Sequence, residues 1–259
     1  MSILESLTPR AGLRVLVTAG AGGIGAKITQ GFIEARGKVH ISDVDADAVA
    51  AATGGGVTGT VADAGAEDAP RRLFAEAREA MGGIDVVVAN AGVAGPTATV
   101  GEISAEDWDQ TLDVNLRGAY LAARFGSPDL IANKGSFIAM SSAAGRLGFA
   151  YRTPYAAAKW GIVGLVKSLA NELGPQGVRA NAIQPGIVEG PRIDRVISAR
   201  AKELGISFEE MKAQNLAKVS LRRMVSPEDI AAACLFLCAP GGSNISGQAI
   251  SVCGNVEAI

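Results

Sequence analysis

The feature that most constrains this chain is a series of short, continuous apolar runs separated by longer segments with helical periodicity. The runs are rich in β-branched residues and do not alternate apolar with polar positions, which is typical of strands buried on both faces of a parallel sheet. In chain order they are RVLVTAG, KVHISDV, GVTGTVAD, IDVVVANAG, GSFIAMSS, VRANAIQPG and GQAISVCG. This pattern predicts an α/β architecture.

The segments between the runs support the same fold. The stretch AGAEDAPRRLFAEAREAMGG carries acidic residues near its start and ends at glycine, as expected of a helix. No linker, repeat or low-complexity tract divides the chain. We therefore predict one doubly wound, Rossmann-type domain over residues 1–259, with a seven-stranded parallel sheet and helices on both faces. Residues 190–222 contain two polar helical pieces that interrupt the alternation, and we expect them to form a lid over the site.

Composition and charge exclude several classes of function. The net charge is -2, which gives no basic surface for nucleic acid or an anionic membrane. No apolar run reaches the roughly 20 residues that span a bilayer, and the start lacks a secretory signal, so we expect a soluble cytoplasmic protein. The single histidine, His40, lies in an apolar run and cannot complete a metal site with Cys234, Cys238 and Cys253. We expect no metal and no disulfide scaffold.

A glycine-rich turn follows the first predicted strand. The segment TAGAGGIGAKI opens a helix and places glycine at Gly20, Gly22, Gly23 and Gly25. Glycine lets backbone N–H groups approach a pyrophosphate at the positive end of that helix. Asp43 ends the next strand, 18 residues after Gly25, where a carboxylate can bind the adenosine ribose hydroxyls and repel a 2′-phosphate. The sequence therefore predicts NAD rather than NADP.

Five further motifs follow in a fixed order: ANAG at 89–92, DVNLRG at 113–118, SS at 141–142, YAAAK at 155–159 and NAIQPG at 181–186. Together with TAGAGGIG at 18–25, they make the chain resemble a classical short-chain dehydrogenase/reductase over almost its whole length. A tyrosine four residues before a lysine is weak evidence alone. The serine 13 residues before that tyrosine, and the asparagine upstream, make the set specific.

The resemblance implies a catalytic tetrad of Asn115, Ser142, Tyr155 and Lys159. A free tyrosine has a pKa of about 10, so proton exchange near neutral pH requires stabilisation of its phenolate. A lysine ammonium about 4 Å away supplies about 4 kcal/mol at an effective dielectric near 20. Ser142 would hydrogen-bond the substrate oxygen. The resemblance also implies that Asn115 holds a water linked to Lys159 and that Lys159 binds the nicotinamide ribose.

The resemblance further implies a set of NAD contacts along the ends of the strands. They are Gly20, Gly22, Gly23, Ile24, Gly25, Asp43, Asp63, Ala64, Asn90, Ala91, Gly92, Tyr155, Lys159, Pro185, Gly186, Ile187 and Val188. Four positions depart from the family pattern: Ala19 replaces a glycine, Ala89 an asparagine, Gly190 a threonine and Cys253 an acidic residue. None of them belongs to the tetrad.

The substrate is expected to meet loops at the carboxyl ends of the strands. These are residues 93–100, residues 143–153 and the lid. Guanidinium groups suit carboxylates, sulfonates and phosphates. We expect an NAD-dependent oxidoreductase that interconverts a secondary alcohol and a ketone on a small polar or anionic hydroxy compound, such as a sugar, sugar acid, polyol or hydroxy acid. The candidate substrate contacts are Val93, Arg146, Arg152, Arg192 and Arg195.

Two other functions stay open. One is reduction of a 3-oxoacyl thioester, an activity whose family members mostly prefer NADPH, so Asp43 argues against it. The other is a non-catalytic dinucleotide-binding module, which would not need the four tetrad residues together. The resemblance also implies a homotetramer in which the helix that carries Trp160 pairs across subunits.

Overall fold

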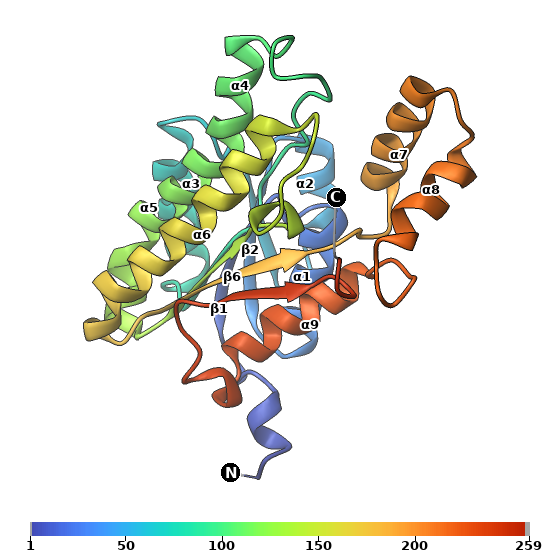
Figure 1. Ribbon diagram of the computed structural model, residues 1–259. Coiled ribbons are helices and arrows are strands. Elements are labelled where there is room, and N and C mark those ends of the chain that lie inside the picture. The colour runs from blue at the N-terminus through green and yellow to red at the C-terminus, as the bar shows by residue number, and fades with distance from the viewer. Residues whose placement is uncertain (1, 257–259) are drawn as a thin grey trace.

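The computed structural model describes residues 2–256, and its seven strands form one sheet with helices on both sides (Figure 1). All neighbouring strands are parallel, in the order β3-β2-β1-β4-β5-β6-β7. Each predicted apolar run contains one strand, which confirms the predicted fold class. The strands are β1 (Arg14–Thr18), β2 (Lys38–Asp43), β3 (Val57–Val61), β4 (Val86–Ala89), β5 (Ser136–Met140), β6 (Arg179–Pro185) and β7 (Ala249–Val252).

The helices cover the sheet in two layers with separate cores. One core packs α3, α5 and α6 against the sheet, and the other packs α1 and α9 against the opposite face. Apolar side chains from both faces of the strands fill these cores, which explains why the strand sequences are continuously apolar. The helices are α1 (Gly23–Glu34), α2 (Ala46–Ala52), α3 (Ala69–Met81), α4 (Ala105–Leu112), α5 (Gly118–Asn133), α6 (Thr153–Leu173), α7 (Pro191–Leu204), α8 (Phe208–Ala217) and α9 (Pro227–Cys238).

The order of the strands reverses between β1 and β4. The chain winds outward from β1 through β2 to β3, then returns to pair β4 with the other side of β1. Ligands of open α/β sheets bind at such a switch point, beyond the carboxyl ends of the strands. The turns after β1, β4 and β5 therefore position the candidate site.

Helices α7 and α8 stand apart from the two layers (Figure 1). They bury Ile197, Ala201 and Met211 in a small core of their own. Ser207 and Glu210 form a reciprocal capping box that fixes the start of α8. The two polar helical pieces expected within residues 190–222 thus exist as a helical pair with its own packing.

His40 is buried in β2, as its apolar surroundings in the sequence indicate. Its ring nitrogens lie 2.8 Å from Thr58 Oγ1 and 2.9 Å from Thr60 Oγ1 of β3. Burial lowers the pKa of His40, so the ring is held neutral inside the sheet. Within residues 2–256, no helix is long and apolar enough to cross a membrane.

Candidate active site

Four side chains that the sequence predicts to be catalytic lie on three segments at the carboxyl edge of the sheet, and we call them the catalytic cluster. Ser142 follows β5, Tyr155 and Lys159 lie in the first turns of α6, and Asn115 comes from a π-helical turn, residues 113–117, that leads into α5. Asn115 and Lys159 are 1% and 3% exposed, whereas Ser142 and Tyr155 are only partly buried. The cluster therefore combines two partly exposed residues that carry hydroxyl groups with two buried polar residues.

Lys159 is the buried cation of the catalytic cluster. Its Nζ donates to the carbonyl of Met140, 2.9 Å away at the end of β5, and lies 5.5 Å from the centroid of the Tyr155 ring. Ser141 Oγ donates to the carbonyl of Lys159 and ties α6 to the same strand end. Burial lowers the pKa of Lys159 to about 7, and the charge of Arg192 acts in the same direction. The ammonium thus stands where it can stabilise a tyrosine phenolate.

Asn115 links the catalytic cluster to a neighbouring loop. Its Nδ2 donates to the carbonyls of Val93 and Thr111, at 3.1 Å and 2.8 Å. Its buried Oδ1 has no partner among the described residues. A Cβ on Gly92 would lie 2.7 Å from this oxygen and 3.3 Å from Lys159 Nζ, so only glycine fits beside them. A buried acceptor next to a lysine suits a bound water, because orphaned buried polar atoms are costly.

Ser142 is oriented by its own backbone. It caps a short 3-10 turn, residues 143–145, and its Oγ accepts a hydrogen bond from the N–H of Ala144 at 3.2 Å. Because the oxygen is used as an acceptor, the hydroxyl proton remains available for donation. The group can therefore donate to the oxygen of a substrate alcohol or ketone.

The glycine-rich turn after β1 keeps an open shape at the start of α1. Gly22 and Gly23 have open space where a Cβ would be, and the first N–H groups of α1 lack intrahelical partners, as at any helix start. Ala19 adopts a φ of 48°, the left-handed value that a glycine would take at ease. A Cβ on Gly25 would collide with the Ala19 carbonyl. The turn has the form that a pyrophosphate requires, and Ala19 preserves it.

Asn90 has a structural role in the same region. Its Nδ2 donates to the carbonyls of Thr18 and Ala19, at 3.0 Å and 3.1 Å. The N–H groups of Asn90 and Ala91 both donate to Thr18 Oγ1. These bonds join the end of β4 to the end of β1 and hold the turn in place, while Gly20 is tied to β2 through its N–H and the carbonyl of Ser42.

The predicted adenosine contacts stand at the ends of β2 and β3. Asp43 Oδ1 accepts from the N–H groups of Val44 and Asp45, and Asp63 Oδ1 accepts from the N–H of Gly65 at 2.9 Å. Ala64 follows Asp63 and packs beside Gly118 at the start of α5. A cavity of about 600 Å³ adjoins Asp63 and is lined by Asp63, Gly65, Ala66, Glu106, Asp109, Gln110, Asp113 and Val114.

The segment after β6 is held in place by other segments of the same chain. Gly186 packs against Cys253, since a Cβ there would lie 2.7 Å from the Cys253 Cα, and its N–H donates to the carbonyl of Val252. The carbonyl of Ile187 accepts from the N–H of Val225 at 2.8 Å. Val188 forms a bridge with the same residue. Residues 185–188 are therefore held between the end of the sheet and the segment that contains Val225.

The candidate arginines separate into two pairs. Arg146 donates from Nη2 to the Val256 carbonyl at 2.7 Å and lies 3.5 Å from Cys253 Sγ, so it secures the end of the described chain. Arg195 is exposed on α7. By contrast, Arg152 Nη2 donates to the carbonyl of Ala94, and Arg192, although exposed like Arg195, donates from Nη1 to the carbonyl of Gly92 at 3.2 Å. We call Arg152, Arg192 and residues 92–94 the arginine rim.

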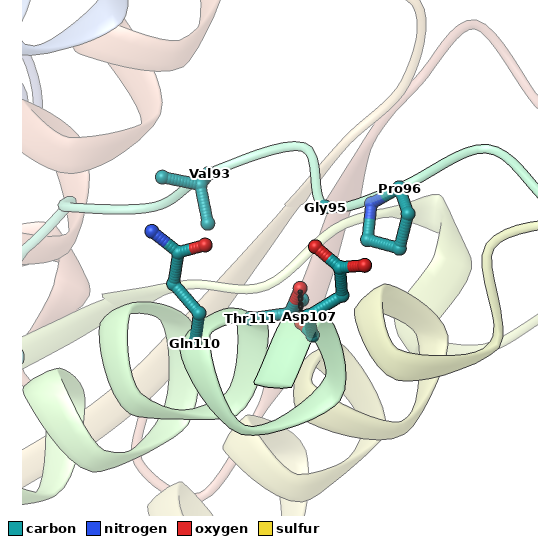
Figure 2. Close-up of a pocket in the computed structure, with 6 residues that line it drawn as sticks. All are labelled: Val93, Gly95, Pro96, Asp107, Gln110 and Thr111. Atoms are coloured by element: carbon teal, nitrogen blue, oxygen red, sulfur yellow. Dashed lines mark hydrogen bonds between the residues drawn. The ribbon is translucent and has the colours of Figure 1, made fainter. Parts of the chain in front are cut away.

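A small cavity lies beside the arginine rim, between the loop after β4 and α4. Figure 2 shows the Asp107 carboxylate and the Gln110 amide extending from α4 toward this loop. The cavity has a volume of about 130 Å³ and is lined by Val93, Gly95, Pro96, Asp107, Gln110 and Thr111. Val93 was a predicted substrate contact, whereas Asp107 and Gln110 were not predicted because a polar helix face carries no distinguishing motif.

Comparisons with known proteins agree with this geometry. A family model described as Enoyl-(Acyl carrier protein) reductase matches residues 19–255. The chain is 33% identical over 245 residues to the (2S)-[(R)-hydroxy(phenyl)methyl]succinyl-CoA dehydrogenase subunit BbsD of Thauera aromatica, covering 92% of this chain and 94% of the relative. It is also 33% identical over 253 residues to the L-fucose dehydrogenase of Bos taurus, covering 96% and 91% of the two chains.

Among solved structures, the fold matches a 3-ketoacyl-(acyl-carrier-protein) reductase from Brucella melitensis complexed with NADH. The TM-score is 0.84 at 26% sequence identity, and the match covers 95% of this chain and 99% of the other. The family model and the relatives each cover most of the chain, in which the catalytic cluster and the glycine-rich turn occur together. The chain therefore belongs to the classical short-chain dehydrogenase/reductase family of oxidoreductases.

Proposed function

We propose that the protein interconverts a secondary alcohol and a ketone with NAD as the redox partner, on a small polar or anionic hydroxy compound. The observation that carries this proposal is the buried ammonium of Lys159, 5.5 Å from the Tyr155 ring centroid and bonded to the end of β5. A fixed cation beside a tyrosine is what proton exchange with an alcohol requires. Relatives named as sugar and acyl-CoA dehydrogenases support the reaction type.

Each residue of the catalytic cluster has a part in alcohol oxidation. Ser142 donates a hydrogen bond to the substrate oxygen and steadies its developing negative charge. Tyr155, as phenolate, accepts the hydroxyl proton, and Lys159 stabilises that phenolate. Asn115 Oδ1 would hold a water that passes the proton from Lys159 toward solvent. When bound, the nicotinamide supplies the hydride acceptor for the substrate carbon. Ketone reduction is the same sequence reversed.

The preference for NAD rests on Asp43. The carboxylate uses Oδ1 to fix the turn that follows β2, and its Oδ2 accepts no hydrogen bond from the described residues. That oxygen can accept from the adenosine ribose hydroxyls, and the negative charge would repel a 2′-phosphate. The turn itself fits a pyrophosphate because Gly22 and Gly23 leave open space above the start of α1.

The proposal is tested by a dehydrogenase screen with NAD⁺ and NADP⁺ over sugars, sugar acids, polyols, sulfonated polyols and hydroxy acids. We expect turnover with NAD⁺, and we expect Asp43→Ala to reduce kcat/KM for NAD⁺ by about 10- to 100-fold, the loss of one or two charge-assisted hydrogen bonds. Asp47→Ala removes an exposed carboxylate from the next helix and serves as the control. A clear preference of the unmodified enzyme for NADP⁺ would refute the role of Asp43.

A second candidate is reduction of a 3-oxoacyl thioester. It is favoured by the match to a 3-ketoacyl reductase that was crystallised with NADH, since a preference for NAD does not by itself exclude such an activity. Acetoacetyl thioesters therefore belong in the same screen with NADH. Faster turnover of these thioesters than of any hydroxy compound would select this function instead.

We also propose that the subunits assemble as a homotetramer through the outer face of α5 and α6. Tyr120 and Ile131 of α5 and Trp160 of α6 are large apolar or aromatic residues with 46%, 38% and 51% of their surfaces exposed. Aromatic side chains of this kind are enriched in subunit interfaces. Light scattering provides the test, and a monomeric mass would exclude the assembly.

A further inference from the structure

We propose that Arg152 and Arg192 bind an oxyanion carried by the substrate, so that the preferred substrate is an anionic hydroxy compound rather than a neutral sugar or polyol. The inference rests on the proposed function and narrows it in two ways. It assigns the recognition of substrate charge to two of the four candidate arginines, and it requires a carboxylate, sulfonate or phosphate group near the reacting carbon.

Arg152 is a buried guanidinium without a carboxylate partner among the described residues. Its side chain is 5% exposed, and none of the ion pairs within residues 2–256 involves it. Nη2 donates to the carbonyl of Ala94, but the buried Nε has no acceptor. A buried charge is unfavourable unless it is paired and hydrogen-bonded. An oxyanion would provide both the missing charge and the missing acceptor.

Two aromatic rings hold the guanidinium of Arg152, and one of them is the ring of Tyr155. Its Cζ lies 5.0 Å from the ring centroid of Phe149 and 4.9 Å from that of Tyr155, and the two rings meet edge to face. Stacking of this type restricts the planar group to one orientation. Because Tyr155 exchanges the proton in the proposed reaction, an oxyanion on Arg152 would belong to the molecule that contacts Tyr155.

Arg192 approaches the same place from the lid. It donates to the carbonyl of Gly92, two residues before the carbonyl that Arg152 binds, so both guanidinium groups attach to residues 92–94. Gly92 in turn borders Lys159 Nζ. Burial is the largest cause that lowers the pKa of Arg152 and of Lys159, and the charge of Arg192 lowers both further, whereas the charge of Tyr155 raises the pKa of Arg152. Arg192 therefore repels both Arg152 and Lys159, and an anion between Arg152 and Arg192 would relieve part of this repulsion.

No carboxylate of the described chain neutralises this group of cations. Asp107 is the acidic residue at the neighbouring cavity, but its Oδ2 accepts from Ser104 Oγ at 2.7 Å at the start of α4. Asp194 is two residues from Arg192 on α7, and side chains at that helical spacing point in different directions. Arg146 also has a buried Nε without an acceptor, but its Nη2 binds the Val256 carbonyl and no described contact joins it to residues 92–94, so Arg152 and Arg192 are the pair at that loop.

We call Arg152 and Arg192, as the proposed oxyanion-binding pair, the clamp. Direct binding of small anions tests the clamp without requiring turnover. The complex of the enzyme with NADH is titrated with acetate, methanesulfonate and methylphosphonate, and with the neutral analogues acetamide and dimethyl sulfone, by calorimetry. We expect the anions to bind more tightly than the neutral analogues, and the order among them identifies the head group. Arg152→Gln and Arg192→Gln should each weaken anion binding by about 10- to 100-fold.

Arg223→Gln is the matched control, because Arg223 is an exposed arginine outside both the catalytic cluster and the arginine rim. It should leave anion binding unchanged. The inference would be overturned if the neutral analogues bound as tightly as the anions, or if no anion bound. It would also be overturned if the Arg152→Gln and Arg192→Gln variants bound anions as tightly as the unmodified enzyme does.

Turnover of matched substrate pairs provides the second test. The pairs are 3-hydroxybutyrate with its amide, and 2-hydroxypropanesulfonate with the corresponding methyl sulfone. We expect kcat/KM to favour the anionic member by about 100-fold, and Arg152→Gln to lower kcat/KM for the anionic member much more than for the neutral member. Arg152→Lys retains the charge and should restore part of the preference. Equal loss for both members, with NADH binding intact, would mean that Arg152 only supports the loop.

The two tests separate failure of the clamp from failure of the proposed function. Binding of anions that depends on Arg152, without oxidation of any alcohol, would leave the clamp standing and reject alcohol oxidation. Oxidation of the neutral members as fast as the anionic ones would keep the proposed function and reject the clamp.

Discussion

The catalytic cluster and the arginine rim each contain a buried cation, but the two cations are held in different ways. Lys159 is bonded to the end of β5 and anchored through α6, so its surroundings belong to the rigid sheet. Arg152 is held by two aromatic rings and one loop carbonyl, and its Nε has no acceptor. The difference teaches that the proposed proton transfer uses a cation anchored to the sheet, whereas the proposed substrate preference uses a guanidinium held by a loop and aromatic rings.

The largest effect is expected from Tyr155→Phe, which removes the proton acceptor. We predict a fall in kcat by about 10²- to 10⁴-fold for every substrate, anionic or neutral, because the proton transfer itself is lost. NADH binding should persist. Tyr151→Phe is the control, since Tyr151 lies four residues earlier and stacks on Arg200 rather than on Lys159. A loss confined to anionic substrates would contradict the division between the cluster and the rim.

The next largest effect is expected from replacement of Lys159, and it is an increase in the stability of the folded protein. Lys159→Met removes a buried charge, so we predict a free energy of unfolding about 1–4 kcal/mol higher at pH 7, together with loss of activity. The folded pKa of about 7 lies below the unfolded value of about 10.4. Between these pH values the unfolded state binds more protons, and the stability of the unmodified protein therefore rises with pH.

The stability gain from Lys159→Met should accordingly shrink as the pH approaches 10. Urea unfolding of both proteins at pH 7 and pH 10, without cofactor, measures this difference. A gain that stays constant between the two pH values would mean that the lysine charge is not the source of the cost.

A smaller effect is expected from Asn115→Ala, which removes the side chain that joins the catalytic cluster to the arginine rim. The variant loses the two hydrogen bonds to the carbonyls of Val93 and Thr111, worth about 1–3 kcal/mol together, and we predict faster proteolysis within residues 93–100. Asn133→Ala is the matched control, because its Nδ2 also bonds two carbonyls, those of Ile84 and Asp129. Equal proteolysis of the loop in both variants would show that Asn115 does not secure it.

The smallest effect is expected in the glycine-rich turn, outside both regions. Ala19→Gly should raise the free energy of unfolding by up to about 1 kcal/mol, because glycine adopts the φ of 48° without steric cost. Lys134 has a similar φ of 51° at the end of α5, so Lys134→Gly should give a similar gain. Thermal unfolding measures both, and a lower stability of only the Ala19 variant would indicate that its methyl group packs usefully.

Most of the sheet and the catalytic cluster could be predicted from the sequence because the signals are local. A buried parallel strand must be apolar throughout, and a tyrosine and lysine one turn apart must share a helix face. The π-helical turn around Asn115 was not predicted, since one extra residue per turn leaves no periodic signal in so short a segment.

The arginines show a second limit of sequence reasoning. Four of them occur near the expected mouth of the site, and nothing in their spacing separates Arg152 and Arg192 from Arg146 and Arg195. The separation comes from distant parts of the chain, namely the carbonyls of residues 92–94 on one side and the Val256 carbonyl on the other. The acidic and amide groups of α4 beside Val93 escaped prediction for the same reason (Figure 2).

The separate core of α7 and α8 has a consequence for how this protein can diversify. The residues that hold the two helices together, Ile197, Ala201 and Met211, pack within the pair and not against the sheet. Substitutions on the face of α7 that carries Arg192 therefore need not disturb the packing of either large core. If the proposed roles of Arg192 and of the catalytic cluster hold, new substrate preferences can arise on α7 at little cost to folding, while the residues proposed for proton transfer stay the same.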